Sequence, residues 1–257
     1  MSAKYNKLAG KHVLVIGGSS GIGLGVAEAS LAAGASVTIS SSSPSKLSTA
    51  TETLLSLLPP SSGQKVQGFA ANLSGADAEA NLEAAFKQAG PVDHVVFTAA
   101  DGLVLTMLQD ITPEEILAAC QMRLVAPLLA GKVAARHSPR SNASSIVFTS
   151  GSASHKSAPG WSMYLYFGAG LQGLVRQLAV EMKPLRVNVV APGQVDTGLW
   201  DHMVEEDRRA MVEGAEGVVP TGRFGQVEDV VEAYLWLMKD RNVTGTVAAT
   251  DGGCLVV

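Results

Sequence analysis

Three glycines in one short turn are the first residues of this chain whose spacing predicts chemistry. They lie in VIGGSSGIG, residues 15–23, after an apolar β-branched run and at the start of a helical pattern. Gly17 permits a tight turn, Gly21 lets backbone N–H groups approach a diphosphate, and Gly23 lets the next helix pack against the strand. The N-terminus of that helix also attracts negative charge. The turn predicts a dinucleotide site formed by Gly17, Ser19, Ser20, Gly21, Ile22 and Gly23, with a merely structural turn as the alternative.

A serine-rich stretch, SSSSPSK at 40–46, stands at the end of the second predicted strand. In dinucleotide-binding folds an acidic residue there binds the ribose 2′-hydroxyl of NAD and repels a 2′-phosphate. This stretch has no Asp or Glu, and it offers hydroxyl groups at Ser41 and Ser42 and a positive charge at Lys46. These residues favour NADP(H) over NAD(H), against the alternative of a loop without cofactor preference.

The elements that must position these residues alternate along the whole chain. Strands are predicted at 12–17, 35–40, 65–70, 93–100, 144–150, 185–193 and 244–250, and helices at 22–33, 45–58, 76–89, 113–137, 161–183 and 227–238. This alternation implies βαβ units with right-handed crossovers, which give a parallel sheet with helices on both faces. We therefore expect a single-domain, doubly wound α/β fold with seven strands over residues 1–257. The polar segment 200–221 follows a strand end and is a candidate substrate lid.

The bulk composition fits a globular enzyme and argues against other classes. The chain is 47% apolar and 16% charged, which suits helices packed on a sheet. A net charge of −4 without a run of Lys or Arg is unlike a nucleic-acid binder. The polar start MSAKYNKLAGK and the lack of an apolar run of about 18 residues predict no signal peptide and no membrane span. The cytoplasm is the expected compartment.

Several motifs together resemble the short-chain dehydrogenase/reductase family over essentially the whole chain. GGSSGIG is similar to its cofactor turn, and ANL at 71–73 resembles its adenine-contacting Asp-Leu step. RVNVVAPGQVDTGLW at 186–200 resembles the strand and PG turn beside the nicotinamide, and TGTVAATDGG at 244–253 resembles the last strand. The resemblance implies a Rossmann-type fold and further cofactor contacts at Asn72, Ala99, Pro192, Gly193, Val195 and Thr197.

The catalytic residues of that family are only partly matched. Ser150 aligns with the serine that polarises the carbonyl, with Ser152 as the second choice, and Tyr164 aligns with the proton-donating tyrosine. The lysine expected four residues later is Gly168. A phenol has a pKa of about 10, and a lysine one turn away favours its ionised form. Without that lysine Tyr164 is a poor acid–base catalyst near neutral pH, and a contact at the pocket wall is its alternative role.

Arg123 and Asp101 are the charged candidates. Arg123 stands where the family has an asparagine, and its guanidinium can bind phosphate, ribose or a substrate carbonyl. Asp101 follows the fourth predicted strand at its cofactor-facing end. Hydride transfer to a cationic iminium gives a neutral amine without a proton donor, and such a substrate favours a nearby anion, which Asp101 would supply. The alternatives are a surface arginine and an aspartate that bonds its own loop.

The chain also resembles a branch of this family from fungal secondary metabolism. That branch includes bifunctional reductase/Diels–Alderases of prenylated indole alkaloid pathways, whose pocket is lined by an aspartate, an arginine and the tryptophan of a PGW motif. These correspond here to Asp101, Arg123 and Trp161, whereas the aspartate expected before PGW is Ala158. Trp161 would stack on a flat or cationic substrate, or alternatively pack at the start of its helix.

The sequence thus predicts an NADP(H)-dependent oxidoreductase that transfers hydride to an activated C=N or C=O of a small secondary-metabolite-like substrate, with a coupled Diels–Alder step as a further option. A cofactor-bound pericyclase or isomerase scaffold and a non-catalytic nucleotide-binding protein stay open as alternatives. The small residues Gly168, Ala169, Gly170 and Gly173 allow close helix approach, and the resembled family commonly forms tetramers through this helix. A homotetramer or homodimer is therefore expected, with no metal, nucleic-acid or membrane partner.

Overall fold

One parallel sheet organises the chain, and the computed structural model describes residues 4–257 of it. The strand order is β3-β2-β1-β4-β5-β6-β7, with every neighbouring pair parallel. The order reverses between β1 and β4, which is the switch point where ligands bind in such sheets. The strands are β1 His12–Ile16, β2 Ser36–Ser41, β3 Val66–Ala70, β4 His94–Phe97, β5 Ser145–Thr149, β6 Arg186–Pro192 and β7 Val247–Thr250.

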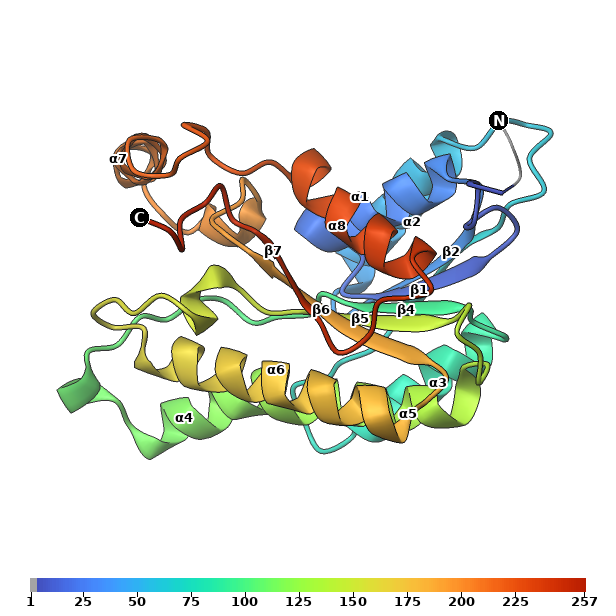
Figure 1. Cartoon of the computed structure of the whole chain (residues 1–257), viewed down its shortest axis with the longest axis horizontal. Helices are drawn as coiled ribbons and strands as arrows, with labels where there is room; N and C mark the ends of the chain where they lie inside the picture. Colours follow the sequence, from blue (N-terminus) through green and yellow to red (C-terminus); the bar gives the residue numbers. More distant parts are fainter. Residues whose placement is uncertain (1–3) are drawn as a thin grey trace.

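Helices cover both faces of the sheet (Figure 1). One face carries α1 (Gly21–Ala32), α2 (Pro44–Ser56) and α8 (Val227–Lys239), and the other carries α3 (Ala78–Ala89), α5 (Ala126–His137) and α6 (Ser162–Glu181). Successive β1 side chains enter opposite cores, since Val13 and Val15 pack under α1 whereas Leu14 and Ile16 pack on the α3 side. The predicted doubly wound α/β fold with seven strands is confirmed.

The predicted helix 113–137 is interrupted in its middle. It consists of α4 (Pro113–Cys120), a π turn over Gln121–Val125, and α5. Single π turns within α-helices are rare and occur frequently at functional sites. This π turn carries Arg123, so the insertion changes the direction in which that side chain leaves the helix.

The same run, Pro113–His137, is long and apolar enough to cross a membrane by length and composition, contrary to the expectation that no such stretch exists. In the structure, however, the α5 half contributes Ala130 and Val133 to the core under the sheet. Lys132 and Arg136 of α5 pair with Glu79 of α3 at 2.8 and 2.9 Å. The buried residues of α5 account for part of this apolar character, whereas Leu117 of α4 and Leu128 of α5 are exposed.

The segment 200–221 contains a helix that the sequence analysis did not predict. Helix α7 spans Glu205–Glu216, and the residues that follow it, Val219 and Pro220, pack against Gly252 and Gly253 near the C-terminal end of the chain. Acidic residues fill its first turn, where they complement the helix dipole, but none of its residues is buried. Its few apolar residues, Met211, Val212 and Ala215, share one side of the helix but are only partly buried, so the segment as a whole is polar and was predicted only as a candidate lid.

Candidate functional site

One cleft of about 850 Å³ at the carboxyl ends of the strands gathers every candidate residue named above. This volume is within the range of small-molecule sites. The candidates come from the turn after β1, the end of β2, the loops after β3, β4, β5 and β6, the π turn and the start of α6. The fold therefore brings together at one edge residues that are far apart in the sequence.

The glycine turn forms a cradle that side chains would fill. Gly17 has φ +90°, and a Cβ there would lie 2.5 Å from the backbone nitrogen of Ala99. A Cβ on Gly23 would overlap the carbonyl oxygen of Gly17. Helix α1 begins at Gly21, so its first N–H groups have no intrahelical acceptor, and they line the cleft. This arrangement fits a diphosphate, because it offers free donors and a positive helix end without side-chain obstruction.

Thr98 holds this turn in place, a role that sequence reasoning missed. The predicted strand 93–100 ends at Phe97, and the Thr98 hydroxyl donates to the carbonyl oxygens of Ile16 and Gly17, both at 3.2 Å. A threonine after a strand gives no sequence signal for this contact, since its acceptors lie about 80 residues earlier.

Hydroxyl groups and one lysine surround the end of β2. Ser19 donates to Ser41 at 2.8 Å, and Ser43 caps α2 by accepting a bond from the backbone nitrogen of Lys46. Lys46 therefore stands on the first turn of α2, and its exposed side chain lines the cleft together with Ser42. Serine hydroxyls, an ammonium group and a helix N-terminus together fit a phosphate monoester.

The loops after β3 and β6, which lie on either side of β1 in the strand order, also line the cleft. Gly193 is tightly packed, because a Cβ there would lie 2.9 Å from Cα of Asp251. Thr197 sits 3.4 Å from where a Cβ of Gly21 would be, and it caps a short 3-10 turn by accepting from Leu199 at 3.3 Å. The Asn72 carboxamide oxygen accepts two bonds from Ser74, at 3.0 and 2.7 Å. Val195 is buried, and Pro192 ends β6.

At the expected catalytic positions the geometry differs from a tyrosine–lysine pair. The Ser150 hydroxyl is buried and has no hydrogen-bond partner among the described residues. A Cβ on Gly168 would lie 2.7 Å from Cβ of Ser154 and 3.2 Å from the Ser150 oxygen. Helix α6 therefore packs too closely on the loop after β5 for a side chain at Gly168, and a lysine there would require that loop to move.

The Tyr164 hydroxyl is engaged by the loop after β4. Its oxygen accepts a hydrogen bond from the backbone nitrogen of Val104, and its hydrogen is donated to the Val104 carbonyl at 3.1 Å. The ring lies 5.6 Å from that of Trp161 at an interplanar angle of 64°. Tyr164 is 7% exposed. The sequence does not predict this contact with Val104, because the tyrosine hydroxyl binds backbone N–H and C=O groups, which do not depend on the type of side chain.

Asp101 and Arg123 form an ion pair in the cleft. The Arg123 guanidinium lies 2.6 Å from an Asp101 carboxylate oxygen, and it also donates to the Asp101 and Gly102 carbonyls at 3.4 Å. The same guanidinium lies 4.4 Å from the ring centroid of Tyr164, within cation–π range. Arg123 is thus not a surface arginine, and Asp101 does not close its own loop. The pair places one negative and one positive group in the cleft that the free Ser150 hydroxyl also lines.

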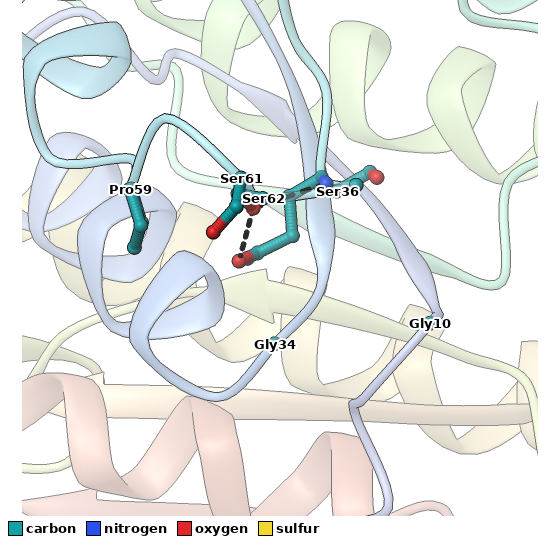
Figure 2. Close-up of a pocket in the computed structure, with 8 residues that line it drawn as sticks. Gly10, Gly34, Ser36, Pro59, Ser61 and Ser62 are labelled. Carbon is teal, nitrogen blue, oxygen red and sulfur yellow. Dashed lines mark hydrogen bonds between the residues drawn. The ribbon is translucent and has the colours of Figure 1, made fainter.

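A second hollow, of about 540 Å³, lies at the amino ends of the strands and is shown in Figure 2. Its polar groups are engaged with one another: Ser62 donates to Gln64 at 2.9 Å, and Gln64 donates to the carbonyls of Leu31 and Ala35 at 2.7 and 2.8 Å. No charged residue is among those that line it. It also lies at the wrong end of a parallel sheet for a ligand site, so we regard it as structural.

Known proteins match this chain along its full length. Residues 4–257 match the family described as the SDR-like Rossmann domain. The short-chain dehydrogenase/reductase fsr5 of Gibberella fujikuroi is 44% identical over 257 residues, which are 98% of this chain and 97% of that protein. The structure of the MalC reductase/Diels-Alderase from Malbranchea aurantiaca has a TM-score of 0.93 at 38% identity, covering 99% of this chain and 100% of that one. A small-chain dehydrogenase in complex with NADPH has a TM-score of 0.78 at 25% identity, covering 96% and 100%.

These matches confirm the resemblance that the motifs indicated, including the fungal branch. The family match spans the described residues from end to end, and a relative far above 30% identity covers nearly all of both proteins. The chain is therefore a short-chain dehydrogenase/reductase-like enzyme and belongs to the short-chain dehydrogenase/reductase family.

Proposed function

We propose that this enzyme is an NADP(H)-dependent reductase of an activated C=N bond, above all a cationic iminium, in a small secondary-metabolite-like substrate, with an activated C=O as the second acceptor. The observation that carries the proposal is the ion pair of Asp101 and Arg123 in the cleft. In the same part of the cleft, the Tyr164 hydroxyl donates its hydrogen bond to Val104, and the packing around Gly168 leaves no room for a lysine. A cleft that contains a charged pair but no tyrosine–lysine pair to donate a proton suits a substrate whose reduction requires no proton.

The cradle around Gly17 and Gly23 and the phosphate-binding groups near Lys46 support NADP(H) as the cofactor. The similar small-chain dehydrogenase bound to NADPH supports the same assignment. When bound, the reduced nicotinamide supplies the hydride. Equal affinities for NADPH and NADH would contradict the assignment.

The side chains of the cleft have separate tasks in this proposal. Asp101 faces the positive charge of an iminium and favours its binding over a neutral compound of similar size. Arg123 holds Asp101 in place and, when the acceptor is a carbonyl, can donate to its oxygen. Ser150 offers an unpaired hydroxyl for the same oxygen, and Trp161 offers an aromatic face to a flat or cationic ring. Reduction of the iminium gives a neutral amine, so no proton transfer is required.

A coupled cycloaddition is the second function that we propose. Its support is the similarity to the MalC reductase/Diels-Alderase, which extends over the whole of both chains. In this version the cleft would hold the reduced product in a folded conformation by shape, which requires no further proton-transfer residue.

Single-turnover experiments separate these functions. The protein loaded with NADPH is mixed with an N-methyl dihydroisoquinolinium salt, a permanent iminium, or with tetralone, a neutral ketone of similar size, and nicotinamide absorbance is followed. Faster consumption with the iminium salt is expected. Faster consumption with tetralone would favour ordinary carbonyl reduction. Binding of NADPH without consumption, even with a wider iminium and ketone panel, would contradict the reductase.

We also propose that the chain self-associates. Leu117 of α4, Leu128 of α5 and Val180 of α6 are 71%, 50% and 64% exposed, on the helices of one face of the sheet. Burial of such side chains between copies would remove apolar surface from water. Light scattering after size exclusion should give a dimer or tetramer mass, and a monomer at every concentration would contradict the proposal.

A further inference from the structure

The loop between β4 and α4 holds Asp101. Its ends are fixed by Thr98, which bonds to the turn after β1, and by Thr106, which donates to Glu115 at 3.2 Å, whereas residues 102–105 carry no polar side chain. Residues 98–107 form neither helix nor strand. Val104 and Leu105 are 59% and 52% exposed, so apolar burial contributes little to the position of the loop. Polar contacts must therefore hold it, because an irregular segment without buried side chains opens easily.

Tyr164 makes two of these polar contacts with a single oxygen. A phenol hydroxyl has one hydrogen to donate and lone pairs to accept. Here the hydrogen is used on the Val104 carbonyl, and the oxygen accepts the Val104 N–H. The tyrosine thus pairs with Val104 as a neighbouring strand residue would. In this arrangement it keeps no hydrogen for a substrate in the cleft.

The ring of Tyr164 makes a further link to the same loop through Arg123. The guanidinium rests on the ring at 4.4 Å, and from there it reaches the Asp101 carboxylate and the carbonyls of Asp101 and Gly102. One side chain of α6 therefore holds the loop at Val104 by its hydroxyl and at Asp101 and Gly102 by way of the guanidinium.

We propose that Tyr164 is a positioning residue that clamps the loop 98–107 and thereby holds Asp101 against Arg123 at the cleft. It acts through Val104 and Arg123 and transfers no proton. Its effect on substrate binding rests on the proposed function, whereas its effect on the loop does not.

The test compares Tyr164→Phe with a matched control, Tyr166→Phe. Tyr166 lies on the same helix, is 68% exposed, and packs its ring 5.2 Å from that of Phe167. Amide hydrogen exchange is measured in the free protein for residues 102–106, with β5 as an internal reference for global stability. Because Tyr164→Phe removes both hydrogen bonds to Val104, exchange of the Val104 amide should be about tenfold faster, with no change in β5. Tyr166→Phe should leave both unchanged.

Kinetics with the iminium salt supply a readout that a merely structural tyrosine would not move. Tyr164→Phe should raise KM for the salt about fivefold or more, because Asp101 is less well held, while the single-turnover rate at saturation stays within about twofold and its pH profile keeps its shape.

Unchanged exchange at Val104 in Tyr164→Phe would overturn the clamp. A rate at saturation about a hundredfold lower with tetralone, whose reduction needs a proton, together with unchanged exchange at Val104, would do so too and would assign Tyr164 as the proton donor. If the wild-type protein consumed no NADPH with any probe, the proposed function would fail, and the exchange comparison would still decide the clamp.

Discussion

Replacement of Asp101 by asparagine tests whether the carboxylate in the cleft selects a cationic substrate. In the wild-type protein Asp101 and Arg123 lie 2.6 Å apart and are neutral as a pair. The amide keeps the shape of the carboxylate but leaves the guanidinium without a counter-charge, so the charge at this point of the cleft rises by one unit. A bound cation would then face a net positive site.

The size of the effect follows from the separation and from the exposure of the pair. Two unit charges about 6 Å apart interact by about 3 kcal/mol at an effective dielectric constant of about 20, and by about 0.7 kcal/mol in water. The Asp101 and Arg123 side chains are 34% and 19% exposed, so the site lies between these limits. We expect a loss of about 1 to 2 kcal/mol, which corresponds to about 5- to 30-fold weaker binding of the iminium.

The assay is single-turnover oxidation of bound NADPH as a function of probe concentration. The concentration of N-methyl dihydroisoquinolinium salt at half-saturation should rise about 5- to 30-fold, while the concentration of tetralone at half-saturation should not change. The double variant Asp101→Asn/Arg123→Gln removes both charges and should recover only the part of the loss that comes from the unpaired guanidinium. Equal weakening of both probes would refute the electrostatic reasoning, because it would show that Asp101 only supports the local structure.

Three further predictions concern the cofactor, the core and pH. Lys46→Ala should weaken NADPH binding about tenfold and leave NADH unchanged in calorimetry, with Lys65→Ala, at the amino end of β3 and outside the cleft, as a silent control. Gly168→Ala should lower the free energy of unfolding by about 1 to 3 kcal/mol in urea titrations because its Cβ meets Ser154 at 2.7 Å, whereas Gly173→Ala, with 4.0 Å to its nearest neighbour, should not destabilise. Burial lowers the pKa of His94 from 6.5 to about 3. The neutral ring is therefore favoured in the folded state, its contribution is complete above pH 6.5, and it is lost as pH falls towards 3. Over that window this one site should reduce the free energy of unfolding by about 1.4 kcal/mol per pH unit, and His94→Gln should remove that part of the slope while exposed His202→Gln should not.

The sequence by itself determined the sheet and the cofactor cradle. Apolar β-branched runs such as that at Val13–Val15 need burial on both faces, which a parallel sheet between two helix layers provides. The glycine spacing has a partly local reason, because the positive φ of Gly17 and the contact of Gly23 with the Gly17 carbonyl involve residues close together in the chain. Such short-range requirements leave a pattern in residue type and spacing.

Tertiary structure alone decided how the catalytic end of the cleft is built. The partner of Tyr164 is the backbone of Val104, 60 residues away, and any residue type presents the same N–H and C=O groups. The closed position at Gly168 depends on how far α6 lies from Ser154. The π turn that aims Arg123 at Asp101 leaves no periodicity signal over its five residues. These features arise from distances between elements, which a linear pattern does not contain, and they decide what chemistry the cleft can perform.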